Sequence, residues 1–214
     1  MSVLNTLIAG AVQHGLMLMG TVHEDQNGQP QSVVLFGTGA GFWPLFTRSS
    51  EYQDGASDPL DRWSVRVVGS IAASVQGTAI FPFGGPPYAP FLSWAETTGE
   101  AFQSPAGMLV HQRAGMMISF RGAVRVQGQL ARPAAAPSPC QNCADQPCKT
   151  ACPVDALSAE RGYNVAACHD YLDTPDGQDC LQNGCKARRA CPVSARFGRD
   201  PAQSAFHMQR FHPS

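Results

Sequence analysis

Apolar residues recur at helical spacing in two segments of the first 80 residues. The first stripe lies between residues 3 and 15 and consists of Leu4, Leu7, Ile8, Ala11 and Val12. The second follows Asp58-Pro59, stops at Gly77 and consists of Leu60, Trp63, Val67, Ile71 and Val75. Both stripes predict amphipathic helices. Asp caps helices, Pro suits their first position and Gly ends them, so the second helix is expected to lie between Asp58 and Gly77.

Shorter apolar runs predict strands. Residues 16–22 and 32–37 predict a pair of strands separated by a polar turn at 24–28. Another strand is expected at 78–83, and three runs at 108–111, 116–120 and 123–126 predict the consecutive strands of a meander. Helices and strands mix without regular alternation, which favours an α+β fold with a mixed or antiparallel sheet.

A change of composition divides the chain. Residues 131–139 have the sequence Ala-Arg-Pro-Ala-Ala-Ala-Pro-Ser-Pro. A segment so rich in Pro is expected to be an extended linker. The sequence therefore predicts a front domain over 1–130, a linker over 131–139 and a second domain over 140–214.

Composition and charge exclude several classes of protein. The 214 residues are 43% hydrophobic and 14% charged, which excludes a disordered chain. A formal net charge of -1 provides no field to attract nucleic acid, and no apolar run reaches the roughly 20 residues of a membrane span. No Lys or Arg precedes Arg48, whereas a secretory signal begins with a basic segment. We therefore expect a cytoplasmic, reducing environment.

Eight cysteines are crowded into the second domain, and none precedes it. They are Cys140, Cys143, Cys148, Cys152, Cys168, Cys180, Cys185 and Cys191. Such crowding indicates either a disulfide framework or metal ligation. Because disulfides are rare in reducing compartments, the sequence favours metal ligands.

The spacing of these cysteines resembles that of bacterial ferredoxins. The first run is Cys140-x2-Cys143-x4-Cys148-x3-Cys152-Pro153, against C-x2-C-x2-C-x3-C-P in ferredoxins, whose fourth Cys ligates the other cluster. The second run also ends in Cys-Pro, at Cys191-Pro192. The resemblance implies two interleaved [4Fe–4S] clusters. One is expected on Cys140, Cys143, Cys148 and Cys191, and the other on Cys152, Cys168, Cys180 and Cys185.

Two alternatives to iron–sulfur clusters remain open, which makes three possibilities in all. Two structural zinc sites would also use eight cysteines in sets of four, although zinc does not call for Cys-Pro twice, and a disulfide framework is the third possibility. Four basic residues lie among the cysteines: Lys149, Lys186, Arg188 and Arg189. They would either offset the negative charge of a cluster or form a solvated patch that docks an acidic electron donor protein.

Residues 138–200 resemble the two-cluster module at the C-terminal end of the epoxyqueuosine reductase family. The resemblance rests on the first cysteine run, the interleaving and the closing Cys-Pro; the wider second run departs from it. In that family a ferredoxin-like unit passes electrons to a bound cobalamin. The resemblance therefore implies a corrinoid as electron acceptor.

The front domain carries a second resemblance. His111-x-Arg113-x-Gly115-x5-Arg121-Gly122 and the helix start Asp58-Pro59-Leu60-Asp61 are similar to elements of the CblC family of cobalamin-processing proteins. This resemblance implies a flavin-nitroreductase-like or CblC-like α+β sandwich that binds cobalamin.

The same resemblance gives three candidate residues for a corrinoid pocket, namely His111, Arg113 and Arg121. Arg121 matches an arginine of the pocket that holds the family's thiol co-substrate. Here it is expected to contact a corrinoid amide, a phosphate, or a carboxylate of its own domain. The other interpretations are a structural role for His111 and an ion pair or surface turn for the arginines.

Together these patterns predict an iron–sulfur protein that takes electrons from a donor protein and passes them through two clusters to a corrinoid. An oxidoreductase that processes cobalamin is the enzyme activity this implies, with no catalytic residue identified. One alternative is a plain ferredoxin-type carrier whose front domain docks a partner. The other is a zinc-stabilised binding module.

Overall fold

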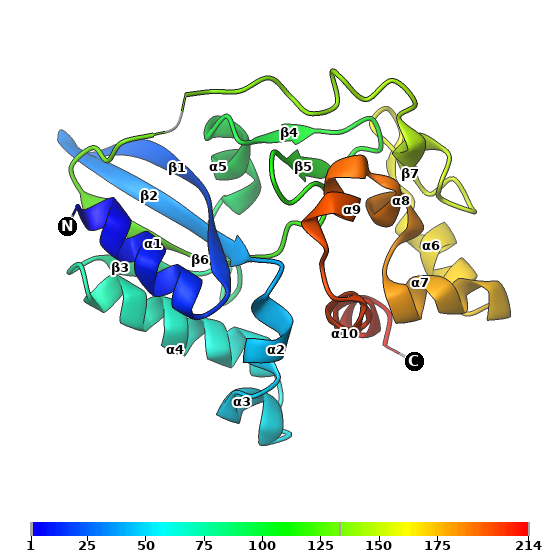
Figure 1. The fold of residues 1–214 in the computed structure, drawn as a ribbon, viewed down its shortest axis with the longest axis horizontal. Helices are drawn as coiled ribbons and strands as arrows, with labels where there is room; N and C mark the ends of the chain where they lie inside the picture. The colour runs from blue at the N-terminus through cyan, green and yellow to red at the C-terminus, as the bar shows by residue number, and fades with distance from the viewer. Residues whose placement is uncertain (1, 133, 214) are drawn as a thin grey trace. The chain divides into compact units, whose positions relative to one another are not determined.

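The computed structural model describes residues 2–132 and 134–213, which form two compact units (Figure 1). The first unit takes the chain up to Glu100 together with 119–136. The second takes 101–118 and the chain from Pro137 onwards. Helices mix with antiparallel sheets, which confirms the predicted α+β class. No helix of the described residues is both long and apolar enough to cross a bilayer.

The first unit is built on a four-stranded antiparallel sheet. Its order is β1 (Leu16–Gln26), β2 (Gln29–Thr38), β6 (Phe120–Gln127) and β3 (Thr78–Ile80). The first two strands are longer than predicted, because polar residues 24–26 pair with 29–31 rather than forming the turn. The turn is Asn27-Gly28, where both φ angles are positive, as a two-residue hairpin requires.

Helices cover this sheet. The unit contains α1 (Val3–Gln13), α2 (Phe42–Phe46), α3 (Ser50–Gln53), α4 (Pro59–Ala73) and α5 (Phe91–Thr97). The central strand β2 is buried continuously from Gln31 to Thr38. Because successive side chains point to opposite faces of a sheet, both faces of this strand are covered. The two predicted apolar stripes are buried in part. Leu7 and Ala11 are buried on α1, whereas Val12 is exposed. On α4 the buried members are Leu60, Trp63, Val67 and Ile71, and the helix ends at Ala73, before Val75.

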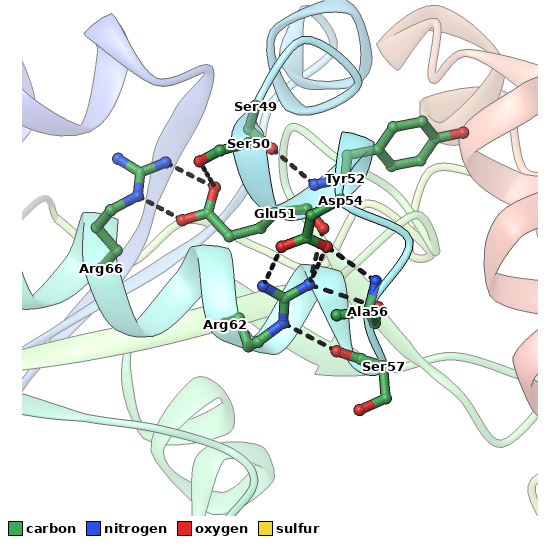
Figure 2. Close-up of polar contacts among 9 residues, drawn as sticks. All are labelled: Ser49, Ser50, Glu51, Tyr52, Asp54, Ala56, Ser57, Arg62 and Arg66. Atoms are coloured by element: carbon green, nitrogen blue, oxygen red, sulfur yellow. Dashed lines mark hydrogen bonds and ion pairs between the residues drawn. The ribbon is translucent and has the colours of Figure 1, made fainter.

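The start of α4 differs from the prediction. Asp58 precedes the helix as expected, but its side chain makes no capping hydrogen bond and its backbone is left-handed, with φ of 49°. An arginine braces this entry instead (Figure 2). Arg62 donates to both carboxylate oxygens of Asp54 at 2.7 and 2.8 Å, and to the carbonyls of Ser57 and Glu51 at 2.9 Å each. These contacts fix the loop between α3 and α4.

An ion pair between Glu51 and Arg66 makes the first unit sensitive to acid. The Arg66 guanidinium donates to the buried Glu51 carboxylate and lowers its pKa from 4.5 to about 2. Because the folded-state pKa lies below the unfolded one, the stabilisation is complete well above pH 4.5 and is lost as the pH falls towards 2. Since Arg66 is half-exposed, the pair is expected to contribute about 1 kcal/mol.

Glu51→Gln is therefore expected to lower the free energy of unfolding by about 1 kcal/mol at pH 7, and by about half as much at pH 3. Urea unfolding followed by tryptophan fluorescence measures this in the first unit, where all three tryptophans lie. As a control, Asp58→Asn removes an exposed carboxylate whose side chain makes no capping hydrogen bond. An equal loss at both pH values would contradict the expectation.

The second unit consists of short elements. Its strands are β4 (Ala101–Gln103), β5 (Leu109–His111), β7 (Leu157–Ser158) and β8 (Gly162–Tyr163). Its α-helices are α6 (Val165–Leu172), α7 (Gln178–Asn183), α8 (Lys186–Ala190), α9 (Pro192–Phe197) and α10 (Pro201–Phe211). Two 3-10 turns are η1 (Pro147–Lys149) and η2 (Pro175–Gly177). Strand β4 pairs with β5, and β7 with β8, both antiparallel.

The predicted meander is wrong. Residues 108–111 correspond to β5, which pairs with β4 in the second unit, whereas 123–126 belong to β6 of the first. Residues 116–119 form no strand. Met116 is instead buried in the core of the second unit, with Val110 and Ala106. The strand expected over 78–83 ends at Ile80.

The domain boundary also differs from the prediction. The described residues of 131–139 have no helix or strand, and Pro133 of that linker lies outside the described residues. The division between the units falls between Ala136 and Pro137. Residues 101–118, assigned from the sequence to the front domain, belong to the compact unit that contains the cysteines.

Candidate metal centres

The β4–β5 hairpin and the cysteine segment share one hydrophobic core. In Figure 1 the green hairpin lies beside the orange helices α8 and α9. The buried members of this core are Ala106, Val110, Met116, Cys148, Leu157, Ala187 and Cys191. Cys148 and Cys191 are buried in this core together with side chains from 101–118, and Cys140 and Cys185 pack against it. The hairpin is therefore part of the scaffold that holds the cysteines.

Gly115 allows the hairpin to approach α9 closely. Its φ is +57°, and a Cβ there would lie 2.3 Å from the backbone nitrogen of Ser194. Next to it, the Met116 N–H donates to the buried Ser194 hydroxyl oxygen at 2.8 Å. Only glycine accommodates both the left-handed backbone and this separation. The glycine of the His-x-Arg-x-Gly motif therefore joins the hairpin to the helix that follows Cys191.

Four cysteines line a first cavity of about 300 Å³: Cys140, Cys143, Cys148 and Cys191. Cys140 and Cys143 lie on one turn, where the Cys143 N–H donates to the Cys140 carbonyl at 3.3 Å. Cys148 lies in η1, and Cys191 lies between α8 and α9. Cys191 is extended, with ψ of 123°, because the following Pro192 disfavours the helical conformation. Cys191 therefore interrupts the helical backbone between α8 and α9, and the chain changes direction beside the cavity.

The other four cysteines line a second cavity of about 290 Å³: Cys152, Cys168, Cys180 and Cys185. Cys152 lies in the loop after η1, Cys168 on α6 and Cys180 on α7. Cys185 immediately precedes α8. The two cavities thus divide the eight cysteines into the two sets that the interleaved pattern predicts.

The cysteines that raise the pKa of a given thiol belong to the same set of four as that thiol. Burial, and after it the proximity of Cys140, Cys191 and Cys143, raises the pKa of the Cys148 thiol. In the second set, burial raises the pKa of Cys168 against an opposing hydrogen bond from Tyr163, and Cys185 and Cys152 raise it further. Clustered thiolates repel one another, and a bound cation relieves that repulsion.

All eight cysteines are free thiols, so the disulfide framework that the sequence left open is not formed. Among residues 2–132 and 134–213, no three His, Cys, Asp or Glu side chains are grouped as ligands of a single metal ion. The sulfurs instead surround cavities. Apolar side chains of the hairpin complete the walls, with Val110 and Met116 at the first cavity and Met108 and Met117 at the second.

The four basic residues of the segment have different environments. Lys149 is exposed. Lys186 and Arg189 both lie against Asp179, at 3.7 and 2.5 Å. Arg188 alone among the four lines a cavity, the second one, and its guanidinium donates to the Met116 carbonyl at 2.9 Å. The sequence could not make this distinction, because it depends on which way each helical residue faces.

The three candidate corrinoid-pocket residues do not lie in one unit. His111 and Arg113 belong to the second unit and Arg121 to the first. His111 is completely buried, and its Nδ1 accepts hydrogen bonds from the N–H groups of Arg113 and Ala114 at 3.2 and 3.3 Å. These two hydrogen bonds fit the structural role that the sequence left open for His111. The Arg113 residue itself is exposed.

Arg121 contacts a carboxylate of its own unit, one of the three partners expected for it. Its guanidinium lies 3.4 Å from Asp61 on α4. Burial lowers the pKa of Arg121, while Asp61 opposes that shift. Burial likewise raises the pKa of Asp61. The contact joins two of the sequence elements that carry the CblC resemblance, the helix start and the Arg121-Gly122 dipeptide.

Several residues around the cavities were not singled out from the sequence. Tyr163 and Arg199 line the second cavity, and Ser194 anchors the hairpin. In the sequence, the closing Cys-Pro marks the start of α9, which contains Ser194, and it is the only motif near any of these residues. Tyr163 and Arg199 have no motif around them. Their positions depend on the packing of short elements.

Comparison of the chain with protein-family models, with curated proteins and with solved structures finds no match in any of the three.

Proposed function

We propose that this chain is an electron-transfer protein whose second unit is a ferredoxin-like domain holding two [4Fe–4S] clusters. The observation that carries the proposal is the division of eight free thiols between two cavities, four to each. In a [4Fe–4S] cluster each iron takes one cysteine sulfur, so four sulfurs surround a volume rather than a point. Bound clusters would supply one-electron chemistry.

The interleaving supports the same proposal. Cys152 follows Cys148 closely in sequence, yet it lines the other cavity, and the distant Cys191 completes the first set. Ferredoxins use this crossing to hold two clusters within one small domain. The protein's part is to fix the eight sulfurs and to exclude water. Val110 and Met116 at one cavity and Met108 and Met117 at the other provide apolar walls for this purpose.

Redox titration tests the proposal against the zinc alternative. Protein prepared without oxygen is expected to be brown and to take up about two electrons per chain from dithionite, one for each cluster. The reduced protein is expected to give electron paramagnetic resonance signals of two interacting spins. A colourless protein that takes up no electrons would contradict the proposal, because zinc has no redox chemistry in proteins.

For the electron acceptor we propose a corrinoid, in keeping with the two resemblances to cobalamin-dependent families. The first unit would then be the CblC-like, flavin-nitroreductase-like sandwich, in which the Arg121–Asp61 contact braces the sheet against α4. Titration of the reduced protein with hydroxocobalamin tests this. Reoxidation of the protein with matching changes in cobalt absorbance is expected, whereas unchanged spectra would leave the plain carrier as the function.

A further inference from the structure

The two cavities differ in the charge of their walls. Arg188 and Arg199 line the second cavity, where both guanidiniums are partly buried and donate to backbone carbonyls of Met116 and Met117. No carboxylate of the described residues pairs with Arg188. The cation that lines the first cavity, Arg196, is exposed to solvent. Water screens an exposed charge far more than a partly buried one, so the second cavity has the more positive surroundings.

Hydrogen bonds to sulfur add to the positive charge at the second cavity. In the second set, the Ala156 N–H donates to Cys152 Sγ at 3.3 Å and the Tyr163 hydroxyl donates to the Cys168 sulfur. The Lys186 backbone N–H donates to the third sulfur, that of Cys180.

Sulfurs of the first set accept hydrogen bonds as well. The Ser138 side chain bonds to the Cys140 sulfur, and the Cys148 sulfur bonds to its own backbone N–H. Hydrogen bonds and positive charge near the sulfurs both stabilise the reduced, more negative state of a cluster.

We infer that the cluster held by Cys152, Cys168, Cys180 and Cys185 has the higher reduction potential and is reduced first. This inference rests on the proposed function. One electron from a low-potential donor protein would enter at the Cys140 set and pass to the Cys152 set, so the first site is oxidised as the second is reduced. The acceptor would then take the electron from the second site. Tyr163 and Arg188 set this direction as positioning residues.

Potentiometric titration of the full chain, followed by electron paramagnetic resonance, tests the assignment. Tyr163→Phe removes only the hydroxyl, and Arg188→Gln removes the charge while keeping a side-chain N–H donor. Each variant is expected to lower the higher of the two midpoint potentials. For Arg188→Gln we expect about a tenfold fall in the ratio of reduced to oxidised cluster at the wild-type midpoint, equivalent to 59 mV for one electron.

Two further variants separate charge from structure. Arg188→Lys keeps the positive charge and is expected to restore the higher potential to near its wild-type value. Arg196→Gln, at the first cavity, is expected to leave that potential unchanged. If Tyr163→Phe and Arg188→Gln shift the lower potential, or leave both potentials unchanged, the inference is overturned while the two-cluster proposal stands. If wild-type protein shows no cluster signals, both fail together.

Discussion

Replacing Cys191 with alanine is expected to destroy the same cluster as replacing Cys143, although the two residues lie in different cysteine runs. Both line the first cavity, so each substitution removes one of its four sulfurs. Iron content is expected to fall from about eight to about four atoms per chain in either variant. The electron paramagnetic resonance spectrum of the reduced protein is expected to lose its spin–spin interaction and keep one set of signals.

Double variants distinguish this arrangement from a sequential one. Cys143→Ala with Cys191→Ala is expected to lose no more iron than either single variant, because both residues serve one site. Cys168→Ala with Cys191→Ala is expected to lose nearly all iron, because Cys168 lines the second cavity. The opposite pattern, with the first pair losing both clusters, would contradict the division of the cysteines. Far-ultraviolet circular dichroism reports whether each variant keeps its helices, because α6 to α10 belong to the second unit.

Gly115→Ala is expected to abolish cluster binding although residue 115 is not a ligand. An alanine would need a left-handed backbone, and its Cβ would lie 2.3 Å from the backbone nitrogen of Ser194. The backbone cost and the overlap together are expected to destabilise the second unit by about 3 kcal/mol. The hairpin would then move away from α9 and take the apolar walls of both cavities with it. Iron analysis and the visible spectrum measure the loss.

Gly198→Ala is the matched control for this substitution. Gly198 also has a positive φ, +68°, but nothing lies within 4 Å of the position that a Cβ would take. An alanine there would destabilise the protein by about 1 kcal/mol through its left-handed backbone, but its Cβ would overlap no other atom. We expect this variant to retain both clusters. Similar iron losses in the two variants would show that close packing of the hairpin does not hold the site together.

The division of the cysteines could be predicted because it depends on local spacing and on Cys-Pro. Tight spacing keeps Cys140, Cys143 and Cys148 on one loop, and the proline after Cys191 sets the backbone where the chain returns. These are constraints between residues adjacent in sequence. The two apolar helical stripes were predictable for the same reason, since their periodicity is local.

The role of 101–118 could not be predicted, because it depends on contacts between residues far apart in the chain. Strand β4 has only three residues, too few to show alternation, and the 116–120 run looks like an ordinary strand. Its Met116 is buried instead against Cys148 and Cys191. The His111 motif was visible in the sequence, but nothing local indicated that it would belong to the cysteine unit.

Two iron–sulfur clusters are expected to occupy the two cysteine cavities. Mössbauer spectroscopy of ⁵⁷Fe-labelled protein prepared without oxygen, with iron and acid-labile sulfide measured on the same sample, tests it most directly. We expect about eight iron and eight sulfide per chain, with the quadrupole doublets of [4Fe–4S] clusters. A folded protein that contains about two zinc ions and no sulfide would contradict the claim.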